Sequence, residues 1–216
     1  MSKKYEIFLF DLDGTITDSA LGITNSVMYA LKKFGIEETD RTKLYKFIGP
    51  PLTESFEKFY GFTKEQSLDG VKYYREYYHD KGIYENRVYD GLEEVLKKIN
   101  EAGKQAIVAT SKPEKYAKII IDHFHLTQYF ACVAGMEMDG GRGTKAQVIT
   151  YALEKNDITD NSKVLMIGDR EHDVIGAHEN GLDCLGILYG FGSRKEFEEA
   201  GADYIRENVE DILQFV

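Results

Sequence analysis

The sequence predicts an α/β fold with a mainly parallel sheet, interrupted after its first strand by an all-helical segment. Strands are indicated by five short apolar runs, at 6–10, 105–109, 130–134, 164–167 and 184–188. Most of these runs are near-continuous rather than alternating, which is typical of strands covered on both faces. From residue 91 onward the runs alternate with segments of helical spacing, as expected for a parallel sheet with helical crossovers.

The connecting helices are expected at 92–102, 113–124, 145–153 and 174–179. Gly103 follows the first of them and is a typical stop signal. Pro113 opens the second at the expected first helical position, where a missing N–H costs nothing. A further helix at 194–200 has a charged face that we expect to be solvated.

The interval between the first strand and residue 91 shows no strand pattern. Apolar faces rich in Tyr and Phe predict helices at 21–34, 44–47, 53–59 and 64–79. We therefore expect two parts. Residues 1–17 and 88–216 form the core domain, residues 18–87 form an inserted helical subdomain, and the hinges lie near 17–21 and 85–90.

Composition and charge exclude several classes of protein. The 216 residues carry 37 acidic and 27 basic side chains, a formal net charge of −10. A nucleic-acid polymer is not expected as a partner, because such binding requires Lys and Arg to neutralise phosphates. No signal-peptide core or transmembrane run is evident, so we expect a cytoplasmic protein without a membrane partner. Cys132 and Cys184 lie in apolar stretches and are expected to be buried, reduced thiols.

Two aspartates follow the first strand. Asp11 and Asp13 are two residues apart on an extended chain, so both side chains point the same way at the carboxyl end of the strand. Ligands of open α/β sheets bind at that edge. Two carboxylates so close together require a cation or a shared proton. Gly14 permits a sharp turn, and Thr15 offers a hydroxyl and an amide to an anion.

Two further strand ends carry complementary chemistry. Thr110 and Ser111 end the second run just before a helix, whose amino terminus favours an anion. Asp169 ends the fourth run, and Asp173 follows in the first helical turn. Carboxylates gathered at one edge suit Mg²⁺, which prefers oxygen ligands. The sequence therefore predicts a Mg²⁺ site formed by Asp11, Asp13, Asp169 and Asp173.

These motifs resemble the haloacid dehalogenase superfamily of phosphotransferases, whose order of motifs spans nearly the whole chain. The matching residues are Asp11-Leu12-Asp13-Gly14-Thr15, Thr110, and Gly168-Asp169 with Asp173. The resemblance implies a Rossmann-like, mainly parallel sheet flanked by helices. It also identifies residues 18–87 as a helical cap like that of the phosphoglycolate-phosphatase and 5′-nucleotidase branch.

The resemblance implies a role for each motif residue. Asp11 would be the nucleophile and Asp13 the general acid and base. Mg²⁺ would be held by Asp11, Asp169 and the backbone carbonyl of Asp13, with Asp173 orienting a metal-bound water. Thr110 and a lysine would stabilise the phosphoryl oxygens. Lys145, at the start of its helix, is the favoured lysine, and Lys112 is the alternative.

The resemblance also implies the substrate contacts and the reaction. Substrate contacts are expected from Gly14, Thr15, Ser111, Arg170 and the cap loop Gly49, Pro50, Pro51 and Leu52. The reaction expected is Mg²⁺-dependent hydrolysis of a small phosphate monoester, either phosphoglycolate or a 5′-nucleotide. A β-phosphoglucomutase-like mutase and a non-catalytic Mg²⁺- and phosphate-binding module are the alternatives. We expect a monomer or a homodimer.

Overall fold

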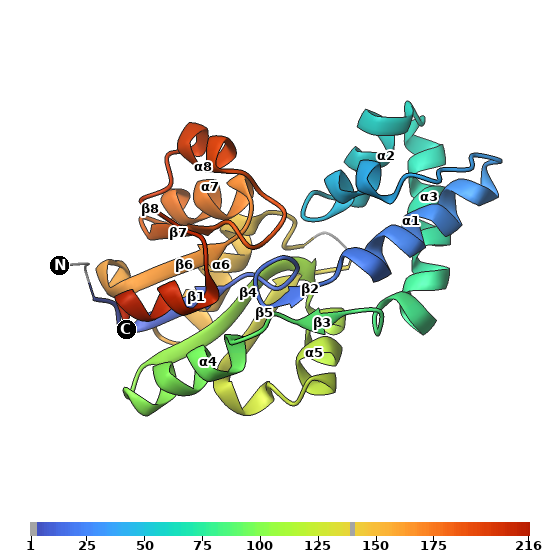
Figure 1. Ribbon diagram of the computed structural model, residues 1–216. Helices are drawn as coiled ribbons and strands as arrows, with labels where there is room; N and C mark the ends of the chain where they lie inside the picture. The colour runs from blue at the N-terminus through green and yellow to red at the C-terminus, as the bar shows by residue number, and fades with distance from the viewer. Residues whose placement is uncertain (1–3, 139–140) are drawn as a thin grey trace. The chain divides into compact units, whose positions relative to one another are not determined.

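The computed structural model describes residues 4–138 and 141–216. The chain divides into two compact units, Met1–Thr17 with Val88–Val216 and Asp18–Arg87 (Figure 1). Among the described residues, no helix is both long and apolar enough to pass through a lipid bilayer.

The first unit is built on a six-stranded sheet. Its strands, in spatial order, are β5 (Phe130–Met136), β4 (Gln105–Pro113), β1 (Ile7–Phe10), β6 (Val164–Gly168), β7 (Asp183–Ile187) and β8 (Tyr204–Arg206). All neighbouring pairs run parallel. The predicted α/β class is therefore confirmed. The sequence analysis missed β8, because a half-buried edge strand of three residues has no recognisable apolar run.

Helices cover the two faces of this sheet (Figure 1). They are α4 (Leu92–Glu101), α5 (Glu114–His123), α6 (Lys145–Lys155), α7 (Glu171–Glu179) and α8 (Arg194–Ala200), with 3₁₀ segments at Thr127–Tyr129, Asn161–Lys163 and Val209–Phe215. Two predicted helix starts were wrong. Pro113 ends β4 and caps α5 instead of opening it. The helix predicted at 174–179 begins at Glu171, because its first turn is polar and gives no apolar pattern.

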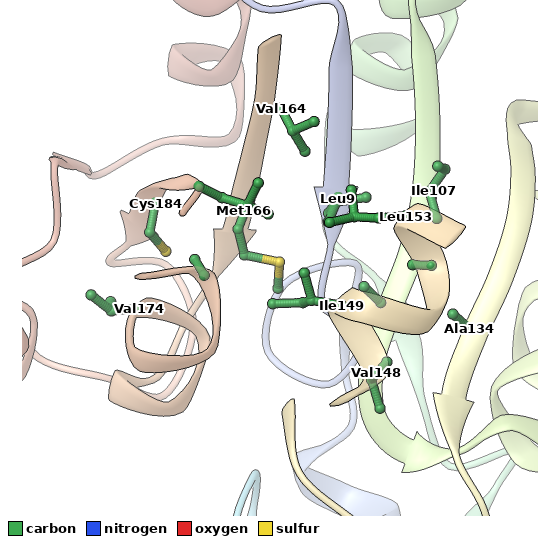
Figure 2. Close-up of a cluster of buried hydrophobic side chains, with 14 of the residues drawn as sticks. Leu9, Ile107, Ala134, Val148, Ile149, Leu153, Val164, Met166, Val174 and Cys184 are labelled. Atoms are coloured by element: carbon green, nitrogen blue, oxygen red, sulfur yellow. The ribbon is translucent and has the colours of Figure 1, made fainter. Parts of the chain in front are cut away.

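The core on one face of the sheet is formed by alternate strand residues and by α6. Leu9, Ile107 and Met166 project from β1, β4 and β6 toward Ile149 of α6, as Figure 2 shows. Residues in odd and even positions of a strand point to opposite faces. The neighbours of Leu9 in β1 are therefore buried on the other face. This double covering explains why the strand runs are almost continuously apolar.

The second unit is all-helical apart from its two ends. It contains α1 (Ala20–Lys33), a 3₁₀ segment (Arg41–Phe47), α2 (Leu52–Tyr60), α3 (Lys64–Tyr77) and a π-helical turn (Tyr78–Gly82). Phe47 and Phe56 pack with ring centroids 5.1 Å apart, and with buried aliphatic side chains such as Val27 and Leu31 they form the core of this unit. The sequence analysis found no strand pattern between the first strand and residue 91. Two strands nevertheless pair at the junction, β2 (Thr17–Asp18) and β3 (Arg87–Val88), each too short to leave a pattern.

Candidate active site

The sheet order brings the predicted motifs to one edge. β1 lies between β4 and β6, so the segments that follow these three strands are neighbours at their carboxyl ends. From β1 the chain adds β4 and β5 on one side and then β6, β7 and β8 on the other. This reversal is a topological switch point, the place where open α/β sheets bind ligands. The Asp11 amide donates to the Ile167 carbonyl oxygen at 2.9 Å and so keeps Asp11 in register with β6.

Lys145 lies at the centre of the site. Its Nζ is 2.8 Å from Oδ1 of Asp11, 2.7 Å from Oδ1 of Asp173 and 3.0 Å from the Ala109 carbonyl oxygen. Burial alone would lower the pKa of Lys145, but the carboxylates of Asp11 and Asp173 raise it above its usual range. Lys145 therefore stays protonated and places a fixed positive charge beside Asp11.

Local structure brings Lys145 to this position. Thr144 accepts the Gln147 amide and the Gln147 side chain accepts the Thr144 amide, so a capping box starts α6 at Lys145. On the neighbouring helix α7, a methyl group at Gly176 would lie 2.6 Å from Cγ of Lys145. Glycine at 176 therefore leaves the room that the lysine stem occupies.

Three buried carboxylates form a candidate metal site. One oxygen each from Asp11, Asp169 and Asp173 lies within 4.8 Å of the others. Burial raises the pKa of Asp169 well above its usual value, and the neighbouring carboxylates of Asp173 and Asp11 raise it further. Among the residues that the structure describes, Oδ1 of Asp169 has no hydrogen-bond partner. A buried oxygen without a partner, in an all-carboxylate cluster, fits a hard divalent cation such as Mg²⁺.

The two oxygens of Asp173 have other partners. Oδ1 faces Lys145, and Oδ2 accepts the Arg170 amide at 3.1 Å, which caps the start of α7. A methyl group at Gly168 would overlap the Asp173 carboxyl group, so this glycine leaves room for it. Asp173 thus anchors Lys145 and α7 beside Asp169.

The second aspartate of the first motif has a lysine partner of its own. Nζ of Lys112, which is 9% exposed, contacts Oδ2 of Asp13. This lysine follows Thr110 on the continued strand β4, where the Thr110 hydroxyl accepts the Lys112 amide at 3.2 Å. The two lysines considered in the sequence analysis therefore contact different aspartates of the first motif. Lys145 contacts Asp11, and Lys112 contacts Asp13. Sequence reasoning missed this role of Lys112, since nothing local pairs it with residue 13.

The backbone amides of the turn after β1 donate hydrogen bonds to carbonyl oxygens of the same turn. Gly14, with φ of +87°, donates its amide to the Thr17 carbonyl oxygen at 2.8 Å, and the Thr15 amide donates to the Leu12 carbonyl oxygen at 3.3 Å. Thr15 is completely buried. Both residues shape the turn that carries Asp13, and their contact with substrate stays a prediction.

The remaining predicted contact residues lie at several places. Ser111 is half-buried on β4 beside Thr110, which is itself buried. The Arg170 guanidinium is held by Glu196, with Nε 2.8 Å from Oε1, so its predicted substrate contact has a competing partner. The loop of Gly49, Pro50, Pro51 and Leu52 belongs to the helical unit, where it leads into α2, and its contact with substrate stays a prediction.

The family follows from comparison with known proteins. A model of haloacid dehalogenase-like hydrolases matches residues 8–187, which include every motif residue of this site. The chain belongs to this family. It is therefore a hydrolase, as the sequence motifs predicted.

Three similar proteins bear on the type of reaction that this chain catalyses. A 5′-nucleotidase of Pseudomonas aeruginosa is 45% identical over 89% of this chain and 87% of its own. The crystal structure of a predicted phosphatase from Clostridium acetobutylicum superposes with a TM-score of 0.94 at 47% identity, covering 98% of both chains. The tyrosine-protein kinase PtkA of Mycobacterium tuberculosis is 35% identical over 87% of this chain, which spans 63% of the kinase. The first two similarities indicate phosphatase chemistry.

Proposed function

We propose that this chain is a Mg²⁺-dependent phosphomonoesterase that hydrolyses a small phosphate ester through an aspartyl-phosphate at Asp11. The observation that carries the proposal is the contact of Lys145 with Asp11, both buried, at 2.8 Å. Asp11 would act as the nucleophile, and the positive charge of Lys145 beside it would attract the negatively charged phosphoryl group.

The reaction takes two steps. In the first, a carboxylate oxygen of Asp11 attacks phosphorus, and the bond between phosphorus and the ester oxygen breaks. Asp13, in its protonated form, gives its proton to the departing oxygen. In the second step a water molecule attacks phosphorus and transfers a proton to Asp13. The bond between phosphorus and the Asp11 oxygen breaks, which releases inorganic phosphate. Both aspartates then return to their starting states.

The phosphoryl group carries negative charge into a site of carboxylates, so compensating charge is essential. Asp11, Asp169 and the backbone carbonyl of Asp13 would hold Mg²⁺, with Asp173 beside them. When bound, the ion supplies positive charge that offsets repulsion between the substrate and the aspartates. Lys145 and the Thr110 hydroxyl stabilise the phosphoryl oxygens from the side of β4 and α6.

The leaving group distinguishes the candidate substrates. The similarity to a 5′-nucleotidase favours a nucleoside 5′-monophosphate, and phosphoglycolate is the second candidate. Residues 18–87 would act as the cap that selects this group. A mutase would instead return the phosphoryl group to a sugar, and a kinase of the PtkA type would pass it to tyrosine. A non-catalytic binding module would bind Mg²⁺ and hydrolyse none of these esters.

One panel of assays separates these possibilities. We expect Mg²⁺-dependent release of phosphate from p-nitrophenyl phosphate and a higher kcat/KM for one ester among nucleotides, phosphoglycolate and sugar phosphates. Asp11→Asn should lower kcat by about 10⁴-fold or more, because it removes the nucleophile. Asp122→Asn, an exposed aspartate on α5, is the control and should match the wild type. Unchanged turnover by Asp11→Asn would refute the proposal, and isomerisation of glucose phosphates would point to the mutase.

A further inference from the structure

The two carboxylate oxygens of Asp169 differ in their hydrogen bonding. Oδ2 accepts the backbone amide of Phe191 at 2.9 Å, whereas Oδ1 has no hydrogen-bond partner among the described residues. Asp169 is completely buried, so bulk water does not supply the missing partner. The amide of Phe191 thus occupies one oxygen and leaves the other available to the carboxylate cluster with Asp11 and Asp173.

The segment that supplies this amide approaches Asp169 more closely than a residue with a side chain could. A methyl group at Gly190 would overlap Cβ of Asp169 and the Gly14 carbonyl oxygen, and would lie 2.8 Å from Oδ2 of Asp169. A methyl group at Gly192 would overlap the Asp169 carbonyl oxygen. Neither glycine has a positive φ. Their need for glycine is therefore steric, and it arises from Asp169 at both positions and also from Gly14 at Gly190.

The same segment is anchored to both aspartate motifs. It runs from 188 to 193, between β7 and α8. On one side the Tyr189 hydroxyl donates to the Thr15 carbonyl oxygen at 3.0 Å. On the other side Oε1 of Glu196, in the first turn of α8, accepts Nε of Arg170 at 2.8 Å and the Glu171 amide at 2.9 Å. The loop is thus fixed to the turn after β1 and to the start of α7.

We propose that the Gly190-Phe191-Gly192 segment is a positioning element for the metal: it binds Oδ2 of Asp169 through a backbone amide and so directs Oδ1 to the cation. This inference rests on the proposed function, because it takes the carboxylate cluster as the Mg²⁺ site. It assigns no contact with substrate to the loop. A fixed partner on the second oxygen of a metal-binding carboxylate orients the first, and loss of such partners weakens metal binding about 10- to 100-fold.

The test measures metal binding directly, with Mn²⁺ as the probe. Dissociation constants are obtained by titration followed by electron paramagnetic resonance, and circular dichroism verifies that each variant is folded. Gly190→Ala should weaken Mn²⁺ binding about tenfold or more, with activity partly restored at high Mg²⁺. Gly192→Ala is the second variant, should the first fail to fold, and should weaken binding in the same direction.

Gly186→Ala is the matched control. Its added methyl group would lie 2.6 Å from the Phe197 ring and not against Asp169, so it strains the neighbouring core without touching the carboxylate. We expect its Mn²⁺ affinity to match the wild type. Wild-type affinity in Gly190→Ala, or an equal loss in Gly186→Ala, would overturn the positioning role alone. Absence of Mn²⁺ binding by the wild type would overturn the proposed metal site and this inference together.

Discussion

Lys112 forms a partly buried ion pair with Asp13, 99 residues earlier in the chain. The pair sets Asp13 apart from Asp11, which faces a different lysine. In the proposed reaction these two aspartates have different tasks, since one attacks phosphorus and the other transfers protons. The structure therefore gives each a separate cationic neighbour, and the consequence can be measured.

Replacing Lys112 with Met should impair proton transfer more than attack on phosphorus, because Asp13 loses the side chain that holds its carboxylate. A general acid increases the rate about 10²–10⁴-fold when the leaving group needs a proton. We expect kcat/KM for an alkyl phosphate to fall about tenfold or more, with a smaller loss for p-nitrophenyl phosphate, whose leaving group is stable as an anion. Lys115→Met, exposed on α5, is the control. Equal losses for both substrates would assign Lys112 another role.

Replacing Lys145 with Met should destabilise the fold, because it leaves Asp11 and Asp173 buried without their counter-charge. Removing one partner of a buried ion pair costs about 3–5 kcal/mol. Urea denaturation should show a lower free energy of unfolding, partly recovered when Mg²⁺ is added. Lys155→Met, exposed near the end of the same helix, should change stability by less than about 1 kcal/mol. Wild-type stability in Lys145→Met would contradict the electrostatic role of this lysine.

Replacing Gly176 with Ala should lower activity even though alanine is the better helix former by about 1 kcal/mol. The added methyl group would lie 2.6 Å from Cγ and 3.0 Å from Cβ of Lys145, so the stem of the lysine that contacts Asp11 must shift. Small misplacements of catalytic groups can cost on the order of 10²-fold in rate. Steady-state kinetics should show a lower kcat. Ile175→Ala, 46% exposed on the same helix, provides the comparison, and a fully active Gly176→Ala enzyme would disprove the steric argument.

The thiol of Cys184 should be unreactive in the native protein. Burial raises the pKa of this thiol well above its usual value, and the carboxylates of Asp173 and Asp203 raise it further. Only the thiolate reacts with disulfide reagents, so a raised pKa keeps Cys184 protonated and inert at pH 9, where exposed thiols are mostly ionised. Titration with Ellman's reagent in a Cys132→Ser variant should give one reactive thiol in urea and none in buffer. Rapid reaction of the native variant would show that this core opens readily.

Local pattern was enough to predict every strand of the main sheet except β8, and the edge at which the motif residues gather. Asp11, Thr110 and Asp169 each follow an apolar run, and the alternation of strands with helices implies that those runs are parallel. Parallel strands share one carboxyl edge, so the three residues had to gather there once the sheet formed. The ends of the helices and strands were less predictable. At Pro113, for example, the sequence predicts the first residue of a helix, whereas β4 continues to this residue and α5 begins after it.

The sequence by itself determined which chemical groups end each strand, and therefore the family and the class of reaction. Only the tertiary structure decided the pairings: Lys145 with Asp11 across 134 positions, Lys112 with Asp13, and the Phe191 amide with Asp169. Such contacts depend on how α6, β4 and the loop before α8 pack against the sheet. A periodic pattern reports only which face of a segment is buried. It carries no information on which distant side chain that face will meet.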